Sequence, residues 1–261
     1  MTTLARRINS HGISHIDEAG DMHFEDGRIW KRGKCYNSIV SGCTRDVDWD
    51  RGGTSYCRAC ALEYEWEIEN EQRREMFTRL CAEYESMGLL PKNFANYKAP
   101  GLYAWQSQAL NDINSDYGRS VWLFADHGNG KTEVGKVALY NALRNAVTAA
   151  YVDCAGTGLS DMARNHNARH GAARARLLVL DDISKMLITD YSAGELHSLL
   201  SDRHQNKLRT IVLSERSGKD FAVALAAKTE KRFGASTVDR LSWKGAPVMA
   251  IEMRGENIRR K

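Results

Sequence analysis

The chain has 261 residues, of which 43% are hydrophobic and 27% are charged, so it can bury a core and we expect it to be soluble. Its formal net charge of +4 at pH 7 is compatible with nucleic-acid contact but does not establish it. No run approaches the roughly 18 apolar residues of a membrane span. Residues 1–7 lack the apolar region of a secretion signal. We therefore expect a cytoplasmic protein without a membrane segment.

The first 60 residues are polar and contain one local signal for strands. Residues 22–30 flank the dipeptide Asp26-Gly27, which is typical of a hairpin turn. The sequence therefore predicts a short β-hairpin here.

Four of the six cysteines cluster in the same region, namely Cys35, Cys43, Cys57 and Cys60. Without a secretion signal, this clustering favours a metal over disulfides. Zn²⁺ binds four thiolates tetrahedrally, and a Cys-x-x-Cys turn supplies two of them. We predict a zinc-binding domain over residues 1–60, with folding stabilised by the metal. Ordinary free thiols are the alternative, and the histidines that could replace one ligand are His11, His15 and His23.

Residues 61–88 are predicted to form a helical connector. They are rich in charge and free of Pro, and their apolar residues recur at i, i+3 and i+4. Gly88 is a suitable C-terminal cap. A second domain over residues 89–261 follows, and a helix is predicted at 105–113. Cys81 and Cys154 stand apart from the cluster and are interpreted as plain core or surface thiols.

Residues 121–132 are predicted to form a strand, a loop and the start of a helix. The loop and helix start read Ala125, Asp126, His127, Gly128, Asn129, Gly130, Lys131 and Thr132. The phosphate-binding pattern has Gly, four residues, Gly, Lys and Ser or Thr, and Ala125 stands in the first Gly position, which requires a negative φ. Gly128 and Gly130 permit positive φ close to the phosphates.

This loop predicts nucleotide binding. Backbone N–H groups at a helix N-terminus form a concavity that binds anions. Lys131 would contact the β- and γ-phosphates, and the Thr132 hydroxyl would coordinate Mg²⁺. A glycine-rich turn that happens to precede a lysine is the alternative.

A hydrophobic strand over residues 176–182 ends in two carboxylates, Asp181 and Asp182. In P-loop enzymes such a strand lies beside the P-loop, and its first acid holds Mg²⁺ through water. The second can orient or deprotonate the attacking water. A helix N-cap after a buried strand is the alternative. Because Asp is one methylene shorter than Glu, we expect slow hydrolysis.

Strands and helices alternate through the rest of the chain. Further strands are predicted at 148–153, 209–214 and 246–253, and helices at 159–173, 195–204 and 221–232. The alternation predicts an α/β domain with a mostly parallel five-stranded sheet covered on both faces. Ligands bind at the carboxyl ends of such strands. Glu215 would therefore lie beside the γ-phosphate if its strand neighbours the P-loop strand.

From Gly88 onward the chain resembles the DnaC/IstB-like family, the helicase-loader branch of the AAA+ ATPases. Residues 125–132 are similar to that family's Walker A loop, and 178–182 to its Walker B strand. Ser214-Glu215 occupies the sensor-one place, where Asn is usual at Glu215. Residues 238–241 resemble the stretch near its trans-acting arginine, and 253–259 resemble its short C-terminal motif.

The resemblance implies an AAA+ core that binds ATP and Mg²⁺, with Asp182, Glu215 and Arg240 as its catalytic residues. Protomers would associate through their ATPase domains when ATP binds. An arginine of one protomer would complete the ATP site of its neighbour, and Arg240 is the first candidate, followed by Arg232 and Arg203. A surface salt bridge is the alternative for each.

The same resemblance implies partners. The core would bind single-stranded DNA, and the N-terminal domain would bind the replicative DNA helicase. Two competing interpretations remain open. One is a transposition helper ATPase of the IstB kind, and the other is a nucleotide-gated adaptor that barely hydrolyses ATP.

Overall fold

The computed structural model describes residues 13–16, 18, 21–25, 29–30, 58–116, 118–229, 233–242 and 247–258. The chain divides into two compact units, 1–72 and 73–261, and each is described by itself. Within the described ranges, no helix combines the length and the apolar character needed to cross a membrane.

The described part of the first unit is a small antiparallel sheet. Its strands β1 (Ile13–Ile16), β2 (Met22–Phe24) and β3 (Ile29–Trp30) pair in that order. Met22 lies opposite Trp30, so the predicted hairpin is confirmed. Strand β1 was not predicted, because the sequence around it shows no sustained alternation of polar and apolar residues.

The predicted zinc ligands lie outside the described residues or at their margin. Cys35, Cys43 and Cys57 are not described, and for Cys60 only a backbone position in the first turn of helix α3 (Arg58–Ser86) is given. Among the residues that the structure does describe, no group of three or more His, Cys, Asp or Glu could hold a metal ion. The zinc domain therefore stays a prediction.

Helix α3 corresponds to the predicted connector. It ends at Ser86, and Gly88 just beyond it has a φ of 71°, the left-handed conformation that favours glycine at a helix end. The N–H of Leu89 donates to the Tyr84 carbonyl at 2.8 Å, and the Leu89 carbonyl accepts from the Tyr151 N–H at 2.7 Å. These bonds attach the end of α3 to the central sheet of the second unit.

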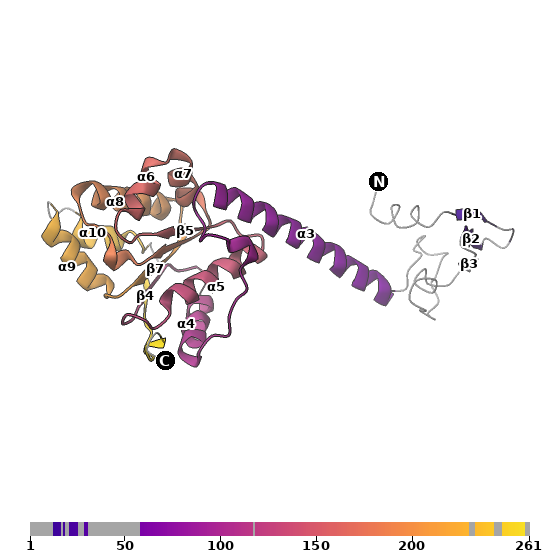
Figure 1. Cartoon of the computed structure of the whole chain (residues 1–261), viewed down its shortest axis with the longest axis horizontal. Coiled ribbons are helices and arrows are strands. Elements are labelled where there is room, and N and C mark those ends of the chain that lie inside the picture. Colours follow the sequence, from indigo (N-terminus) through magenta and orange to yellow (C-terminus); the bar gives the residue numbers. More distant parts are fainter. Residues whose placement is uncertain are drawn as a thin grey trace. The chain divides into compact units, whose positions relative to one another are not determined.

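The second unit is built on a five-stranded parallel sheet (Figure 1). The strands are β4 (Val121–Phe124), β5 (Ala149–Asp153), β6 (Leu177–Asp181), β7 (Arg209–Ser214) and β8 (Met249–Glu252). Their order is β5-β6-β7-β4-β8, and every neighbouring pair is parallel. The predicted parallel sheet is confirmed. Because β7 neighbours β4, the carboxyl end that leads to Glu215 lies next to the P-loop.

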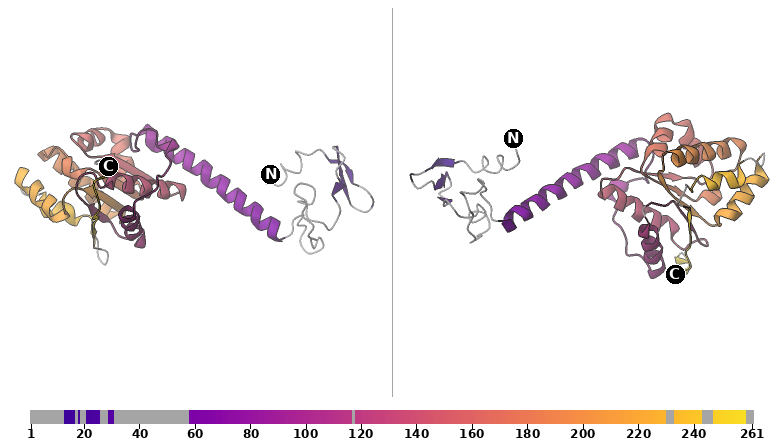
Figure 2. Two further views of the ribbon diagram at one scale, coloured as in Figure 1. Left: turned by 60° about the horizontal axis from the view of Figure 1, so that its bottom comes forward. Right: turned by 180° about the vertical axis from the view of Figure 1, so that it is seen from behind.

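Helices cover both faces of this sheet, as predicted (Figures 1 and 2). They are α4 (Ala104–Ser115), α5 (Lys131–Arg144), α6 (Gly158–Arg164), α7 (His166–Arg174), α8 (Asp190–Gln205), α9 (Gly218–Lys228) and α10 (Gly234–Asp239). Figure 1 shows α4 and α5 on one side of the sheet and α6, α7 and α8 on the other. Strands β4 to β7 are almost fully buried, whereas β8 is partly exposed. Cys81 and Cys154 are buried free thiols, so the core is the correct one of the two places expected for them.

The single helix predicted at 159–173 is wrong in one respect, because the segment contains two helices. Asn165 has extended backbone angles between α6 and α7, and its side chain accepts a hydrogen bond from the Ala168 N–H at 3.2 Å. This is an N-cap, which favours starting a new helix. The hydrophobic pattern alone did not show that Asn165 would cap a second helix.

Arg203 is a structural residue rather than an available arginine. Its side chain is 1% exposed. Its guanidinium donates to the carbonyls of Ala172 at 2.7 Å and Ala175 at 2.8 Å, and to the Thr210 hydroxyl at 2.9 Å. It therefore joins α7 to β7 inside the core. This arrangement removes Arg203 from the candidates that could reach a neighbouring protomer.

Candidate functional site

The loop between β4 and α5 has the backbone that the sequence predicted. Gly128 and Gly130 have φ values of 85° and 83°. Ala125 is not among the residues with positive φ, so alanine fits the first position of the motif. Helix α5 begins at Lys131, and its first turn follows directly on the loop. The loop is therefore shaped to present N–H groups to an anion.

Two distant segments support the loop. From α4, Trp105 Nε1 donates to the Asn129 carbonyl and Gln106 Nε2 donates to the Gly130 carbonyl, each at 3.4 Å. From the C-terminal segment 253–258, the Ile258 N–H donates to the Gly128 carbonyl at 3.1 Å. The sequence suggested a C-terminal motif but did not predict that it packs on the loop.

Lys131 is folded into the loop. Its side-chain ammonium donates to the carbonyls of Ala125 at 2.7 Å and Asp126 at 2.9 Å, and the residue is 6% exposed. Burial lowers the pKa of Lys131, while the nearby carboxylates of Glu215 and Asp182 oppose that shift. The ammonium therefore lies among the acids that the sequence assigned to the same site.

Asp181 and Thr132 lie together, as a Mg²⁺ site requires. Asp181 is 3% exposed and accepts hydrogen bonds from the Tyr151 hydroxyl at 2.6 Å and the Asp182 N–H at 2.8 Å. Burial raises the pKa of Asp181, and the hydrogen bonds from Tyr151 and Thr132 partly offset this. A hydroxyl and a carboxylate at the P-loop are the hard oxygen ligands that Mg²⁺ prefers, so these two residues fit the ion.

Asp182 follows in a left-handed conformation, with a φ of 49°. Its carboxylate accepts hydrogen bonds from the ammonium of Lys185 on both oxygens at 2.9 Å. Lys185 is the last residue of the short 3-10 helix η3 (Ile183–Lys185). Lys185 was not predicted as a site residue, although its spacing of three residues from Asp182 is the kind that one helical turn brings together.

Glu215 belongs to the same network. Its carboxylate lies 3.3 Å from the Lys185 ammonium and 3.0 Å from His127 Nδ1. Burial acts to raise the pKa of Glu215, but hydrogen bonds from His127 and Lys185 outweigh it and the pKa is lowered. The Glu215 carboxylate is therefore held by two basic side chains, His127 and Lys185.

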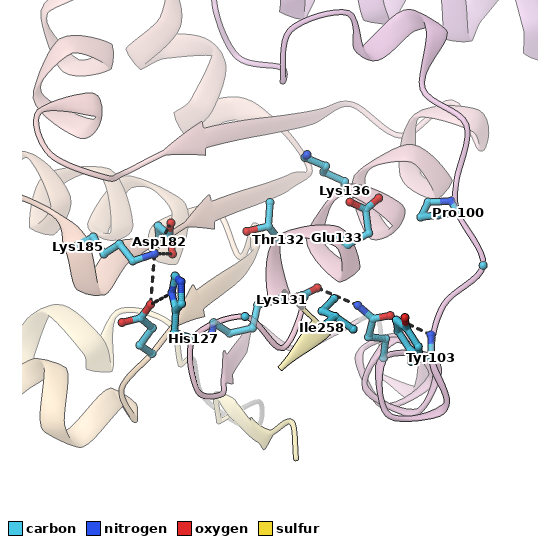
Figure 3. A pocket seen from close by; sticks show the side chains of 15 residues that line it. Pro100, Tyr103, His127, Lys131, Thr132, Glu133, Lys136, Asp182, Lys185 and Ile258 are labelled. Carbon is cyan, nitrogen blue, oxygen red and sulfur yellow. Dashed lines mark hydrogen bonds and ion pairs between the residues drawn. The ribbon is translucent and has the colours of Figure 1, made fainter. Parts of the chain in front are cut away.

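These residues share a cavity of about 430 Å³ (Figure 3). Lys131, Thr132, Asp182 and Glu215 line it, together with Gly128 and Gly130. The remaining lining residues include Lys136, Lys185 and Tyr103, which were not predicted as site residues. Figure 3 shows Lys185 with Asp182 and His127 on one side of Lys131, and Tyr103 on the other.

Five predicted residues do not line this cavity. Ala125, Asp126 and Asn129 line a second hollow of about 400 Å³. Asp181 is buried and lines neither hollow. Arg240 is exposed at the C-terminal end of α10 and lines neither hollow. A role for Arg240 in its own protomer's site is therefore not favoured by its position.

No family model matches the chain, and no curated protein matches it. Several solved structures do. DnaI has 16% identity and a TM-score of 0.49, over 63% of this chain and 95% of that one. The DnaC helicase loader has 19% identity and a TM-score of 0.42, over 61% and 96%. AMPPCP-bound DnaA from Aquifex aeolicus has 18% identity and a TM-score of 0.43, over 65% and 52%. The resemblance to the DnaC/IstB-like AAA+ ATPases therefore rests on the sequence motifs.

Proposed function

We propose that this protein binds ATP with Mg²⁺ in the 430 Å³ cavity and hydrolyses it slowly. The observation that carries the proposal is that Lys131 and Thr132, at the start of α5, lie near Asp181 at the end of β6. The Thr132 side chain lies close enough to Asp181 to lower its pKa, so the two side chains that would hold Mg²⁺ lie near each other. A P-loop of this shape binds phosphates through backbone N–H groups, with the lysine as a point charge.

Each acid has a separate task in this proposal. Asp181 holds the ion through water, and Asp182 orients or deprotonates the attacking water. Bound Mg²⁺ would neutralise charge on the phosphates. Glu215, at the end of the neighbouring strand, faces the terminal phosphate through its basic partners. Since Lys185 occupies both oxygens of Asp182, the water-activating step is expected to be slow.

We infer that the ATP-dependent task is loading a replicative DNA helicase. The inference is supported by the order of the motifs at 125–132, 178–182 and 253–259 along the chain. In this scheme the N-terminal unit binds the helicase and the ATPase core binds single-stranded DNA. Arg240, which is exposed, completes the site of a neighbouring protomer.

A pull-down of the cognate replicative helicase tests the loader proposal. The full chain should retain the helicase in the presence of ATP and Mg²⁺, and Lys131→Ala should retain less of it. Lys228→Ala, an exposed lysine at the end of α9, is the matched control and should behave as the wild type. Retention of a transposase and assembly on double-stranded DNA, without helicase binding, would instead support the IstB-like interpretation.

The ion pair between Lys185 and Asp182 favours one further candidate, a nucleotide-gated adaptor that binds ATP with little turnover. Both candidates require ATP binding, so the rate of phosphate release separates them. A turnover that disappears in Lys131→Ala supports the ATPase. Tight ATP binding with no turnover, alone or with DNA and helicase, supports the adaptor.

A further inference from the structure

A second lysine faces the candidate phosphate site. Lys185 lines the same cavity as Lys131 and Thr132, and its side chain is 37% exposed. It belongs to η3, directly after the strand that carries Asp181. The P-loop motif does not include this residue, so its charge is an addition to the usual lysine.

The contacts of Lys185 show that it joins two acids. Its ammonium lies 2.9 Å from both oxygens of Asp182 and 3.3 Å from Glu215. Burial acts to lower the pKa of Lys185, but hydrogen bonds and charge from the two carboxylates outweigh it, so the pKa is raised. Lys185 is therefore charged at neutral pH and is held by its contacts with Asp182 and Glu215.

The same two acids lie close enough to Lys131 to act on its pKa, as does Lys185 itself. A terminal phosphate placed at Lys131 would thus stand near two carboxylates. The two carboxylates and the phosphate carry like charges, which repel each other in a partly buried site. A mobile cation between the acids and the phosphate would remove that repulsion. Lys185 is the lysine in this position, because Lys136 forms no ion pair with Asp182 or Glu215 among the described residues.

We propose that Lys185 binds the terminal phosphate of ATP and leaves Asp182 when it does. The proposal rests on the nucleotide site proposed above. Its first consequence is that the site prefers ATP to ADP, because ADP lacks the phosphate that Lys185 would contact. Its second consequence is release of Asp182, whose carboxylate becomes available to the attacking water only when a triphosphate is bound. Lys185 would then sense the terminal phosphate, a task for which the family that the chain resembles uses Asn.

Binding of a non-hydrolysable ATP analogue and of ADP, each with Mg²⁺, tests the proposal in the full chain. Isothermal titration should show that Lys185→Met weakens the analogue about 10- to 100-fold, the usual effect of losing a hydrogen bond between charged groups. ADP affinity should change less than about threefold. Lys185→Arg should restore much of the preference, and Lys228→Met is the matched control for loss of a surface lysine.

Glu215→Gln should strengthen analogue binding where Lys185→Met weakens it. A misfolded variant would not bind the analogue more tightly, so this result cannot arise from misfolding. Removing this carboxylate releases Lys185 and takes a negative charge away from the phosphate, so the analogue should bind at least about threefold tighter, with ADP affected less. Equal changes for both nucleotides, or no change in Lys185→Met, would overturn the inference while leaving the nucleotide site intact. If the wild type binds neither nucleotide, the proposed function and this inference both fail.

Discussion

The side chain of Asn257 lies directly against the backbone of Gly128. A Cβ added to Gly128 would stand 2.3 Å from Asn257 Oδ1, far inside van der Waals contact. The adjacent Ile258 N–H donates to the Gly128 carbonyl at 3.1 Å. The C-terminal segment 253–258 thus packs on the P-loop at Gly128, and we expect the conformation of the loop to depend on this contact, called the clamp below.

Gly128→Ala tests this clamp. The φ of 85° alone should cost about 1–2 kcal/mol in the free energy of unfolding. The clash with Asn257 should add about 1–3 kcal/mol and weaken nucleotide binding. Gly156→Ala is the matched control, since Gly156 has a φ of 59° but no atom within 4 Å of an added Cβ. Urea unfolding of both variants measures the difference.

The double variant Gly128→Ala/Asn257→Ala separates the two contributions. Shortening Asn257 removes the clash but leaves the positive φ, so the double variant should be about as stable as the sum of Asn257→Ala and Gly156→Ala predicts. If Gly128→Ala costs no more than Gly156→Ala, the contact with Asn257 does not constrain the loop.

Local features of the site were predictable from sequence, and long-range ones were not. Residues 125–132 form one continuous loop and helix start, so spacing alone predicted the positive φ of Gly128 and Gly130. The strand order was not predicted, so Glu215 was placed near the loop only on the condition that its strand neighbours β4, and the sheet meets that condition. By contrast, Gln106 and Ile258 reach the loop only through tertiary packing, and no periodicity in their own segments indicates it.

Two wrong predictions have a different origin, since each depends on the hydrogen bonds of one polar side chain. Asn165 divides a continuous helical pattern by capping α7 with its own side chain. Arg203 was interpreted as a candidate trans-acting arginine or a surface salt bridge, yet its guanidinium donates to the buried carbonyls of Ala172 and Ala175. The partner of a buried polar side chain depends on which backbone groups still lack a hydrogen bond after the chain has folded. The sequence does not show which groups these are.

Arg203→Met should destabilise the second unit strongly. It leaves the buried carbonyls of Ala172 and Ala175 without their donor, and each unsatisfied buried group costs about 1–3 kcal/mol. The free energy of unfolding should therefore fall by at least about 3 kcal/mol. Arg174→Met, a nearby exposed arginine, should change it by less than about 0.5 kcal/mol. Equal small effects in the two variants would contradict the structural role of Arg203.

Asp181 should make the stability of the nucleotide-free protein fall as the pH rises. Its pKa is raised by burial above the ordinary value of 3.8, so the folded state holds the proton more tightly than the unfolded chain. That contribution is fully present below the unfolded pKa and is lost as the pH passes through the raised folded pKa. Asp181→Asn removes the buried charge and should stabilise the protein more at pH 7.5 than at pH 4.

The measurement is the free energy of unfolding in urea at the two pH values, without Mg²⁺. Asp153→Asn is the matched control, because Asp153 ends the neighbouring strand but is exposed. A constant difference between Asp181→Asn and the wild type across this pH range would mean that Asp181 titrates normally. Loss of Mg²⁺-dependent nucleotide binding in Asp181→Asn would separately support its role toward the ion.

The cysteine cluster predicts about one Zn²⁺ per chain when the protein is purified without chelator. Cys57→Ser should lose the metal and the folded state of the first unit, since structural zinc contributes roughly 10–16 kcal/mol in zinc-finger peptides. Cys81→Ala should keep the metal, because Cys81 is a buried thiol of the second unit. Elemental analysis measures the stoichiometry, and a zinc content near zero in the wild type contradicts the prediction.

Arg240→Ala should keep the fold and the nucleotide affinity but lose hydrolysis. Arg240 is exposed and lines neither hollow, so its removal should change the free energy of unfolding by less than about 0.5 kcal/mol. An arginine supplied by a neighbour can contribute roughly 10³–10⁵ in rate. The wild-type rate per chain should therefore rise with protein concentration, and the rate of Arg240→Ala should not.

Mixing two inactive variants decides whether Arg240 acts between protomers. Lys131→Ala has a defective site but an intact Arg240, whereas Arg240→Ala has an intact site and no arginine to donate. If Arg240 acts on the neighbour, the mixture regains phosphate release that neither variant shows alone, because one protomer supplies the arginine to the other's ATP. A mixture that stays at the sum of its parts, while wild-type protein is active, assigns the trans-acting role elsewhere in the chain.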